Sequence, residues 1–210
     1  MELFSSGQVL QNRVAGIHHP DLWRFNEYHW GYMVNNREQR INESNKVSDE
    51  LLGKTTQMLA IETMEDNDAL IRKHAIFLLG FSRNTEHINS LIKALKDPEK
   101  AVRNQAARAL AEIGEPASER LIQSLDDPDW KVRYRSAEAL GLMKHQGAIG
   151  PLVSLLHDEK DHVRYMAVKS LGLIGDPAAR EPLLVVQTDE NPYVRKAAKL
   201  VLSRLSEQRI

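Results

Sequence analysis

Side chains that could hold a metal ion come closest together in residues 157–162, whose sequence is HDEKDH. Two histidines and two aspartates stand there: His157, Asp158, Asp161 and His162. Imidazole nitrogens and carboxylate oxygens are ligands that zinc and similar divalent ions accept. Charged residues between helices are more often simply solvated, so we expect no metal ion here and no cofactor elsewhere.

Other classes of chemistry are excluded by what the chain lacks. It has no cysteine, which rules out disulfides, zinc ribbons, iron–sulfur clusters and thiol catalysis. No glycine-rich phosphate loop and no Ser/His/Asp order of a hydrolase is recognisable. The sequence therefore favours a non-enzymatic protein, although it leaves enzymatic activity open.

Charge and hydropathy bear on partners and location. The 28 Lys and Arg residues are balanced by 29 Asp and Glu residues, which argues against a surface that neutralises many phosphates. We expect no nucleic acid as partner on this ground. The chain has neither a signal peptide nor a run of 18 apolar residues, so we expect a soluble, cytoplasmic protein.

Aromatic residues gather in residues 18–34, HHPDLWRFNEYHWGYMV. Five of the chain's twelve aromatics lie there: Trp23, Phe25, Tyr28, Trp30 and Tyr32. Three roles are open for this segment. It could cap the end of a helical array, it could dock on a partner or a second copy of the chain, or its aromatics and histidines could hold a ligand.

The elements that must position these side chains follow from an internal repeat. Five segments superimpose with steps of 30 or 31 residues: LIRKHAIFLLG, AVRNQAARALA, KVRYRSAEALG, HVRYMAVKSLG and YVRKAAKLVLS. Each has an aliphatic anchor before an Arg, a small residue four positions later and a Leu eight positions later. The anchors are Ile71, Val102, Val132, Val163 and Val194.

This spacing predicts two helices in each unit. Anchor, small residue and Leu share one face of the second helix, and Leu residues four positions apart mark the first helix. Turns rich in Asp and Pro, such as KDPEK and DDPDW, separate the two helices. Because one such hairpin cannot bury its apolar face alone, neighbouring hairpins must stack.

The repeated unit resembles the HEAT repeat, and specifically the short variety found in phycobilisome lyases. The resemblance covers roughly residues 50–208. It implies a ladder of Asp and Arg side chains between adjacent repeats. The corresponding residues here are Asp66, Asp97, Asp127, Asp158 and Asp189 with Arg72, Arg103, Arg133, Arg164 and Arg195.

In HEAT arrays the concave surface, lined by the second helices, usually binds the partner. We expect the residues two and three positions after each anchor to face it. A central aromatic patch with flanking residues is the predicted site: Trp130, Tyr134, Arg135, Tyr165, Met166, Lys73 and His74. Tyr, Trp, Arg and Met are enriched at protein interfaces.

Relatives of this repeat suggest further activities. Deoxyhypusine hydroxylases bind two irons through His-Glu pairs in the second helices, but here those positions hold pairs such as Tyr134-Arg135 and Tyr165-Met166. Alkylpurine DNA glycosylases use a cationic groove, which the near-neutral charge disfavours. Phycobilin lyase subunits hold a tetrapyrrole and its apoprotein, so a bilin-handling chaperone is the main alternative.

The sequence as a whole predicts an all-α, right-handed solenoid of the armadillo/HEAT type. Residues 1–48 form an aromatic extension and a polar linker, and residues 49–210 form the array. The five predicted repeats span about 50–84, 85–115, 116–146, 147–177 and 178–208. The predicted function is a protein-binding scaffold or adaptor, with another protein or a second copy as partner.

Overall fold

A computed structural model describes residues 60–207, which all belong to one unit of the chain, residues 57–210. The predicted boundary at residue 48 and the aromatic segment around Trp23 and Trp30 lie outside the described residues. Throughout the described part every regular element is a helix.

In residues 69–207, five longer helices alternate with four shorter ones. The longer, second helices of the repeats are α5 (Ala69–Phe81), α7 (Lys100–Ile113), α9 (Trp130–Leu142), α11 (Asp161–Ile174) and α13 (Pro192–Glu207). The shorter, first helices are α6 (Ile88–Ala94), α8 (Ser118–Gln123), α10 (Ile149–Ser154) and α12 (Arg180–Val185). Short 3-10 turns flank the first helices: η1 (Thr85–His87), η2 (Glu115–Ala117), η3 (Ser124–Asp126), η4 (Gln146–Ala148), η5 (Leu155–His157), η6 (Pro177–Ala179) and η7 (Val186–Thr188).

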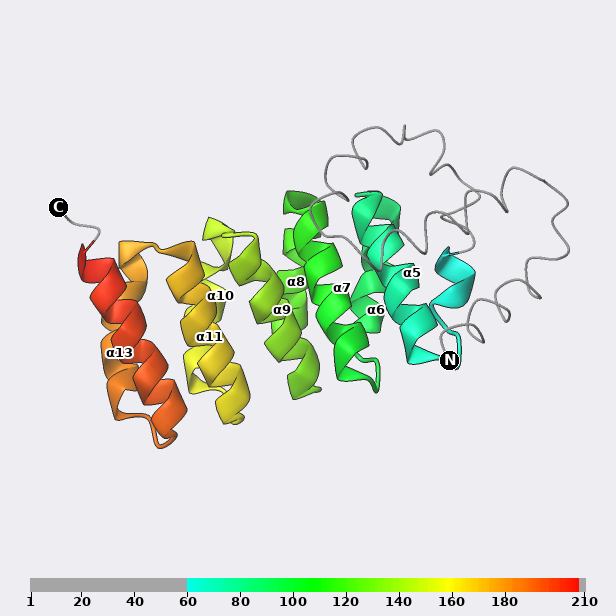
Figure 1. Cartoon of the computed structure of the whole chain (residues 1–210). Helices are drawn as coiled ribbons and strands as arrows, with labels where there is room; N and C mark the ends of the chain where they lie inside the picture. The colour runs from blue at the N-terminus through cyan, green and yellow to red at the C-terminus, as the bar shows by residue number, and fades with distance from the viewer. Residues whose placement is uncertain (1–59, 208–210) are drawn as a thin grey trace, which may run out of the picture. The chain divides into compact units, whose positions relative to one another are not determined.

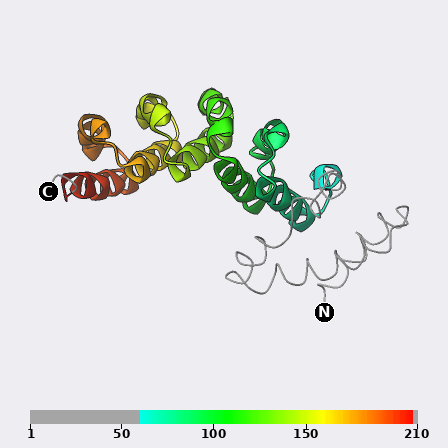
Figure 2. The ribbon, with the colours of Figure 1, turned by 90° about the horizontal axis from the view of Figure 1, so that it is seen from above.

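The helices form two layers. The second helices lie side by side (Figure 1), each packed on the next. Viewed from above, the first helices stand on one side of that row (Figure 2). This is the predicted all-α solenoid of stacked helical hairpins.

Helix boundaries follow local chemistry. The side chains of Asp68 and Asp129 accept hydrogen bonds from the backbone N–H of Leu70 and Lys131, and so cap the N-termini of α5 and α9. After α7 and α11 come Gly114 and Gly175, whose φ angles of 80° and 75° favour glycine. An Asp side chain therefore marks the start of α5 and α9, and a Gly marks the end of α7 and α11.

The core lies between the two layers, where the anchor face of each second helix meets the first helices. In α9, Val132, Ser136 and Leu140 are completely buried, as are the matching residues of α7 and α11. Leu121 and Leu152 of the first helices are also completely buried. The spacing of anchor, small residue and Leu predicted this face.

Three glycines let neighbouring second helices approach closely. Gly80, Gly141 and Gly172 each stand nine residues after an anchor. A Cβ atom added at Gly141 would lie 2.8 Å from the Cα atom of Ser170 on α11. The hydroxyl of Ser170 donates to the carbonyl oxygen of Ala137 over 2.7 Å, so α9 and α11 are also joined by a buried hydrogen bond.

The Arg and Asp side chains connect adjacent repeats at three junctions. Arg133 donates from Nε and Nη2 to the carboxylate of Asp158, at 2.7 and 2.9 Å. Arg72 holds Asp97 and Arg164 holds Asp189 in the same way. Each Arg also donates through Nη1 to the carbonyl oxygen of its own repeat's Asp, so one guanidinium stabilises a turn and a junction together.

The junction between α7 and α9 departs from the predicted ladder. Arg103 donates to the carbonyl oxygens of Asp97 and Pro98 in its own turn, but it makes no ion pair with Asp127. Lys96 takes that place, with its Nζ atom 2.9 Å from Asp127 Oδ2. The anchor spacing, 30 residues here and 31 at the other junctions, is the local difference in sequence.

The same junction also lacks the packing glycine. Ala111 stands where the other helices have Gly80, Gly141 and Gly172. At this junction α7 packs on α9 less extensively than α9 packs on α11. The row of second helices bends near this place (Figure 2), with the first helices on its outer side.

Candidate partner-binding face

Each of the five longer helices, the second helices of the repeats, has one face that points away from the first helices. Its residues lie one position before the anchor and two, six and ten positions after it, a spacing that keeps them on one side of a helix. We call this set the outward face. It comprises Leu70, Lys73, Phe77 and Phe81 on α5; Ala101, Asn104, Arg108 and Glu112 on α7; Lys131, Tyr134, Glu138 and Leu142 on α9; His162, Tyr165, Lys169 and Leu173 on α11; and Tyr193, Lys196, Leu200 and Arg204 on α13.

Two of the predicted site residues are buried instead of exposed. Arg135 is 6% exposed and Met166 is 4% exposed. Both stand three positions after an anchor. Their side chains therefore contribute to packing within the array, and the expectation that they line a binding surface was wrong.

The two predicted tyrosines do lie on the outward face, each with a cation from its own helix over its ring. The guanidinium carbon of Arg135 is 4.8 Å from the ring centre of Tyr134, and Lys169 Nζ is 5.7 Å from that of Tyr165. Burial, with a smaller contribution from Glu138, raises the pKa of the Tyr134 hydroxyl. Both rings are half-buried against the core, so packing fixes their positions while part of each ring stays exposed and can contact a partner.

Trp130 has a different neighbour from the one expected. Its ring centre lies 5.5 Å from that of His162 on α11, and no ring contact joins it to Tyr134. His162 Nδ1 is 2.7 Å from Asp161 Oδ1, and Asn191 donates to the other oxygen of that carboxylate. Trp130 therefore connects the starts of α9 and α11.

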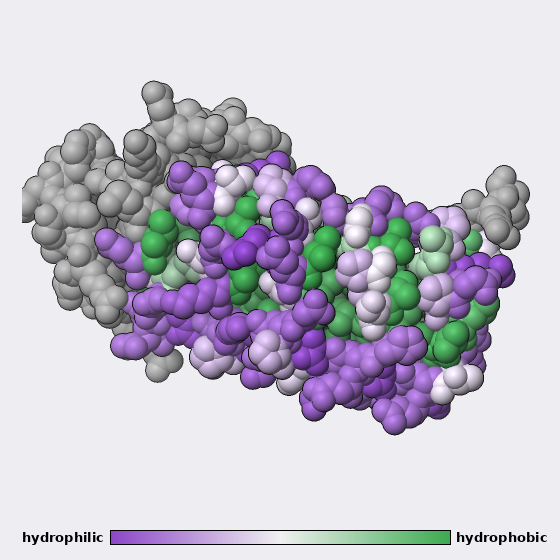
Figure 3. All heavy atoms as spheres, turned by 180° about the vertical axis from the view of Figure 1, so that it is seen from behind, coloured by the Kyte–Doolittle hydropathy of each residue, from purple (hydrophilic) through white to green (hydrophobic). Residues whose placement is uncertain are grey.

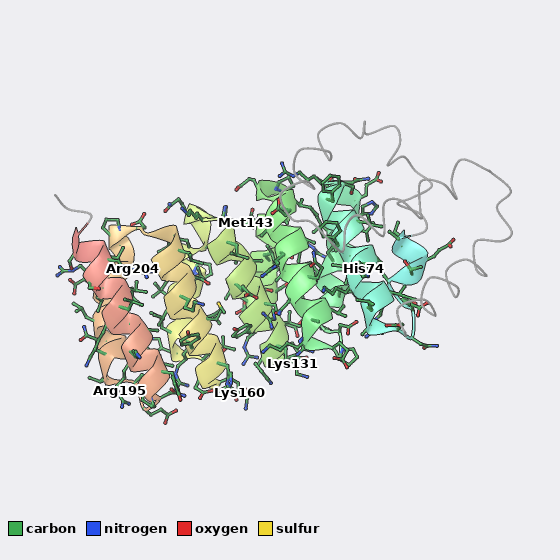
Figure 4. All side chains as sticks on the ribbon, in the orientation of Figure 1. His74, Lys131, Met143, Lys160, Arg195 and Arg204 are labelled. Carbon is green, nitrogen blue, oxygen red and sulfur yellow. The ribbon has the colours of Figure 1, made fainter. Side chains whose placement is uncertain are left out.

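Lys73 and His74 stand at the N-terminal end of the described array. His74 Nδ1 lies 2.8 Å from the carbonyl oxygen of Leu70, one turn earlier in α5. Burial lowers the pKa of the His74 imidazole. Lys73 and His74 are half-buried, and His74 lies on α5, at the opposite end of the described array from Arg204 on α13 (Figure 4).

Large apolar side chains remain exposed along the outward face. Leu142 and Leu173 are 48% and 42% exposed at equivalent positions, and Leu200 is 53% exposed on the next helix. Phe77 and Phe81 stack on α5 with ring centres 6.3 Å apart. On α7 the positions six and ten after the anchor hold Arg108 and Glu112. The series of exposed apolar residues is therefore interrupted at α7, next to the junction between α7 and α9 that lacks the arginine–aspartate pair.

The charge on the outward face of α9, α11 and α13 is predominantly positive. It carries Lys131, Lys169, Lys196 and Arg204 against one acid, Glu138. Glu138 already pairs with Arg135. No carboxylate pairs with the four cations in the described part of the chain. Lys131 stands at the start of α9 and Arg204 toward the end of α13 (Figure 4).

Sequence reasoning missed most of these residues. It selected the positions two and three after each anchor, whereas the outward face consists of those one before and two, six and ten after, which are exposed or half-buried. Lys131, Lys169, Leu142, Leu173, Leu200 and Arg204 were left out for this reason. Their spacing of three, four and four residues was the available signal.

The opposite side of the array is formed by the first helices. Figure 3 shows apolar side chains in furrows between hydrophilic ridges on this side. A furrow of about 570 Å³ lies between Ile122 and Pro151, and Arg133 and Asp158 also line it. Leu125 and Leu155 in this furrow are nearly buried, so its apolar lining is largely the core itself.

The HDEKDH segment is used within the array. Asp158 pairs with Arg133, and Asp161 binds His162 and Asn191. Within the described residues no three His, Asp or Glu side chains are grouped so that they could hold a metal ion. Among the described helices, none is both long enough and apolar enough to cross a membrane.

Comparison with protein families gives a direct assignment. A family model described as HEAT repeats matches residues 56–119 and 118–203, which together make up most of the chain. The chain belongs to the HEAT-repeat family. The two matched segments meet between α7 and α9, where the ladder and the glycine spacing are interrupted. A comparison with curated proteins finds no match.

Two solved structures place this HEAT array among known solenoids. The complex of CpcE and CpcF of phycocyanin lyase from Nostoc sp. PCC7120 is 26% identical, with a TM-score of 0.54 over 72% of this chain and 65% of that one. The chain therefore spans slightly less than two thirds of that lyase chain. An engineered protein is 21% identical, with a TM-score of 0.51 over 94% and 98% of the two chains.

Proposed function

We propose that this HEAT array is a non-enzymatic scaffold that binds another protein through the outward face of α9, α11 and α13. One observation carries the proposal: half-buried tyrosines, exposed leucines and cations without acidic partners share this one face. Exposed apolar residues beside anchored aromatics are typical of interfaces. The similar lyase structure is itself a complex of two proteins, which supports a protein partner.

Site-specific photocrosslinking tests this proposal in the cells from which the chain comes. A photoreactive amino acid at Tyr165 would stand on the outward face, whereas one at Glu119 would stand in the layer of first helices. We expect a discrete crosslinked protein from position 165 and none from position 119. Equal crosslinking at both positions, or none at either, would contradict the proposal.

A lyase-like chaperone that holds a bilin and its apoprotein is the second candidate. The 26% identity to phycocyanin lyase favours it over other activities. The paired tyrosines offer flat apolar surface, and Lys169 and Lys196 could meet the carboxylates of a tetrapyrrole. Mixing the purified protein with free phycocyanobilin distinguishes the two candidates. A change in the visible absorbance of the bilin would mean that it binds and would favour the chaperone, whereas an unchanged spectrum would favour the scaffold.

A further inference from the structure

We infer that the outward face of α9, α11 and α13 binds an extended acidic segment that carries aliphatic residues. This inference rests on the proposed function and specifies the chemistry of the partner. The chain as a whole has a net charge of −1, but this face has four cations without acidic partners. Acidic residues of the partner would complement them.

The positions of the cations favour several acidic contacts along one segment. Lys131, Lys169 and Lys196 stand on three successive helices, and Arg204 lies two turns beyond Lys196 on α13. They come from four different rows of the outward face, and each of the three helices carries at least one of them beside its tyrosine or leucine residues. A partner with acids on either side of its aliphatic residues would therefore meet a cation at each repeat.

The apolar residues set the spacing of the partner's aliphatic side chains. Leu142, Leu173 and Leu200 are exposed on consecutive helices. Packed helices are about 8–10 Å apart. A polyproline II segment advances about 9 Å in three residues and returns each third side chain to the same side. One aliphatic residue in every three would thus meet one leucine per repeat.

The two N-terminal repeats do not continue this surface. On α7 the corresponding rows hold Arg108 and Glu112, and Glu112 pairs with Arg83 over 3.3 Å. On α5 the rows are aromatic, with Phe77 and Phe81 stacked on each other. The binding surface therefore begins after the irregular junction and includes three repeats.

Fluorescence anisotropy with labelled twelve-residue peptides tests the inference on the full chain. The probes are (Glu-Glu-Leu)₄, its basic counterpart (Lys-Lys-Leu)₄ and its polar counterpart (Glu-Glu-Ser)₄, with the oligonucleotide dT₁₂ as a polyanion without aliphatic groups. We expect (Glu-Glu-Leu)₄ to bind at least tenfold more tightly than each of the other three.

Two double variants with the same change in charge locate the site. K169E/R204E reverses two cations of the outward face and should weaken (Glu-Glu-Leu)₄ binding at least tenfold. R120E/K160E reverses two cations elsewhere, on α8 and in the turn before α11, and should change it less than twofold. Circular dichroism melting of both variants checks that the array is intact.

The inference is wrong if (Lys-Lys-Leu)₄ or dT₁₂ binds as tightly as (Glu-Glu-Leu)₄, if no peptide binds, or if both double variants lose affinity equally. The proposed function can survive that result. If position 165 crosslinks to a protein but acidic peptides bind no more tightly than the others, the outward face still binds a partner, and that partner is not an acidic segment.

Discussion

Lys96 and Asp127 form an ion pair of 2.9 Å at the place where the other described junctions have an arginine and an aspartate. The lysine is about half exposed, whereas the arginines of the ladder are 9–11% exposed. A lysine offers a single charged group and cannot match a carboxylate with two parallel hydrogen bonds. We therefore expect the ion pair at the junction between α7 and α9 to stabilise the array less than the arginine–aspartate pairs do.

Replacing Arg133 with Ala should destabilise the protein by about 2–3 kcal/mol, because the nearly buried Asp158 would lose its partner. The matched change Arg103→Ala removes only hydrogen bonds to two carbonyl oxygens and should cost about 1 kcal/mol. Urea denaturation of both variants measures the difference. Equal losses would show that the ladder contributes nothing at the Arg133 junction.

Amide hydrogen exchange should show two blocks of different protection, with the boundary at the junction between α7 and α9. Stability in a solenoid depends on the interfaces between neighbours, so a weak interface separates blocks that open independently. We expect a step in amide protection between α7 and α9, and a larger step in Lys96→Ala. A gradual change along the helices in both proteins would contradict the division.

Adding one methyl group at Gly141 should be costly. The new Cβ atom would stand 2.6–2.8 Å from atoms of Ser170, including its backbone Cα atom. Gly141→Ala should therefore destabilise the protein by about 2 kcal/mol. The control is Gly150→Ala, where nothing lies within 4 Å of the added atom and a gain of about 0.5 kcal/mol is expected. Thermal melting that ranks the two variants in the opposite order would refute the packing role.

Acid should weaken the ladder. Burial opposes ionisation of Asp189, but hydrogen bonds from Arg164 and from the Asn191 N–H outweigh it and hold the pKa of this carboxyl below its ordinary value. Because the folded pKa is lowered, this stability is present above about pH 4 and is lost as the pH falls through the folded pKa.

The variant Asp189→Asn tests this dependence. Its free energy of unfolding should be well below that of the wild type at pH 6, and the difference should narrow at pH 3. Asp126→Asn, at an exposed aspartate at the end of η3, is the control and should change the free energy of unfolding little at pH 6. A difference for Asp189→Asn that stays constant with pH would contradict the lowered pKa.

The repeat period predicted the fold because it records a simple physical requirement. Each hairpin must bury the same face against its neighbour, so Val132, Ser136 and Leu140 recur in every copy with little change. Ladder contacts also follow the period, except at Arg103 and Asp127. That exception coincides with a spacing that is one residue shorter and with Ala111 in place of the glycine.

The binding face was harder to predict than the fold. Sequence reasoning placed Arg135 and Met166 beside Tyr134 and Tyr165 because they are adjacent in the chain. A rotation of 100° per residue leaves the tyrosines half-buried and buries Arg135 and Met166, although the Arg135 guanidinium still lies over the Tyr134 ring. Which of two adjacent positions is exposed depends on how closely the next helix packs.

The most direct test of the central claim compares two exposed aliphatic residues on opposite sides of the array. Leu173 is 42% exposed on the outward face of α11, and Val185 is 64% exposed on α12 among the first helices. The affinity of Leu173→Asp and Val185→Asp for the protein captured by crosslinking at position 165 can be measured by isothermal titration calorimetry. The account predicts at least a tenfold loss for Leu173→Asp and no change for Val185→Asp, and the reverse result would contradict it.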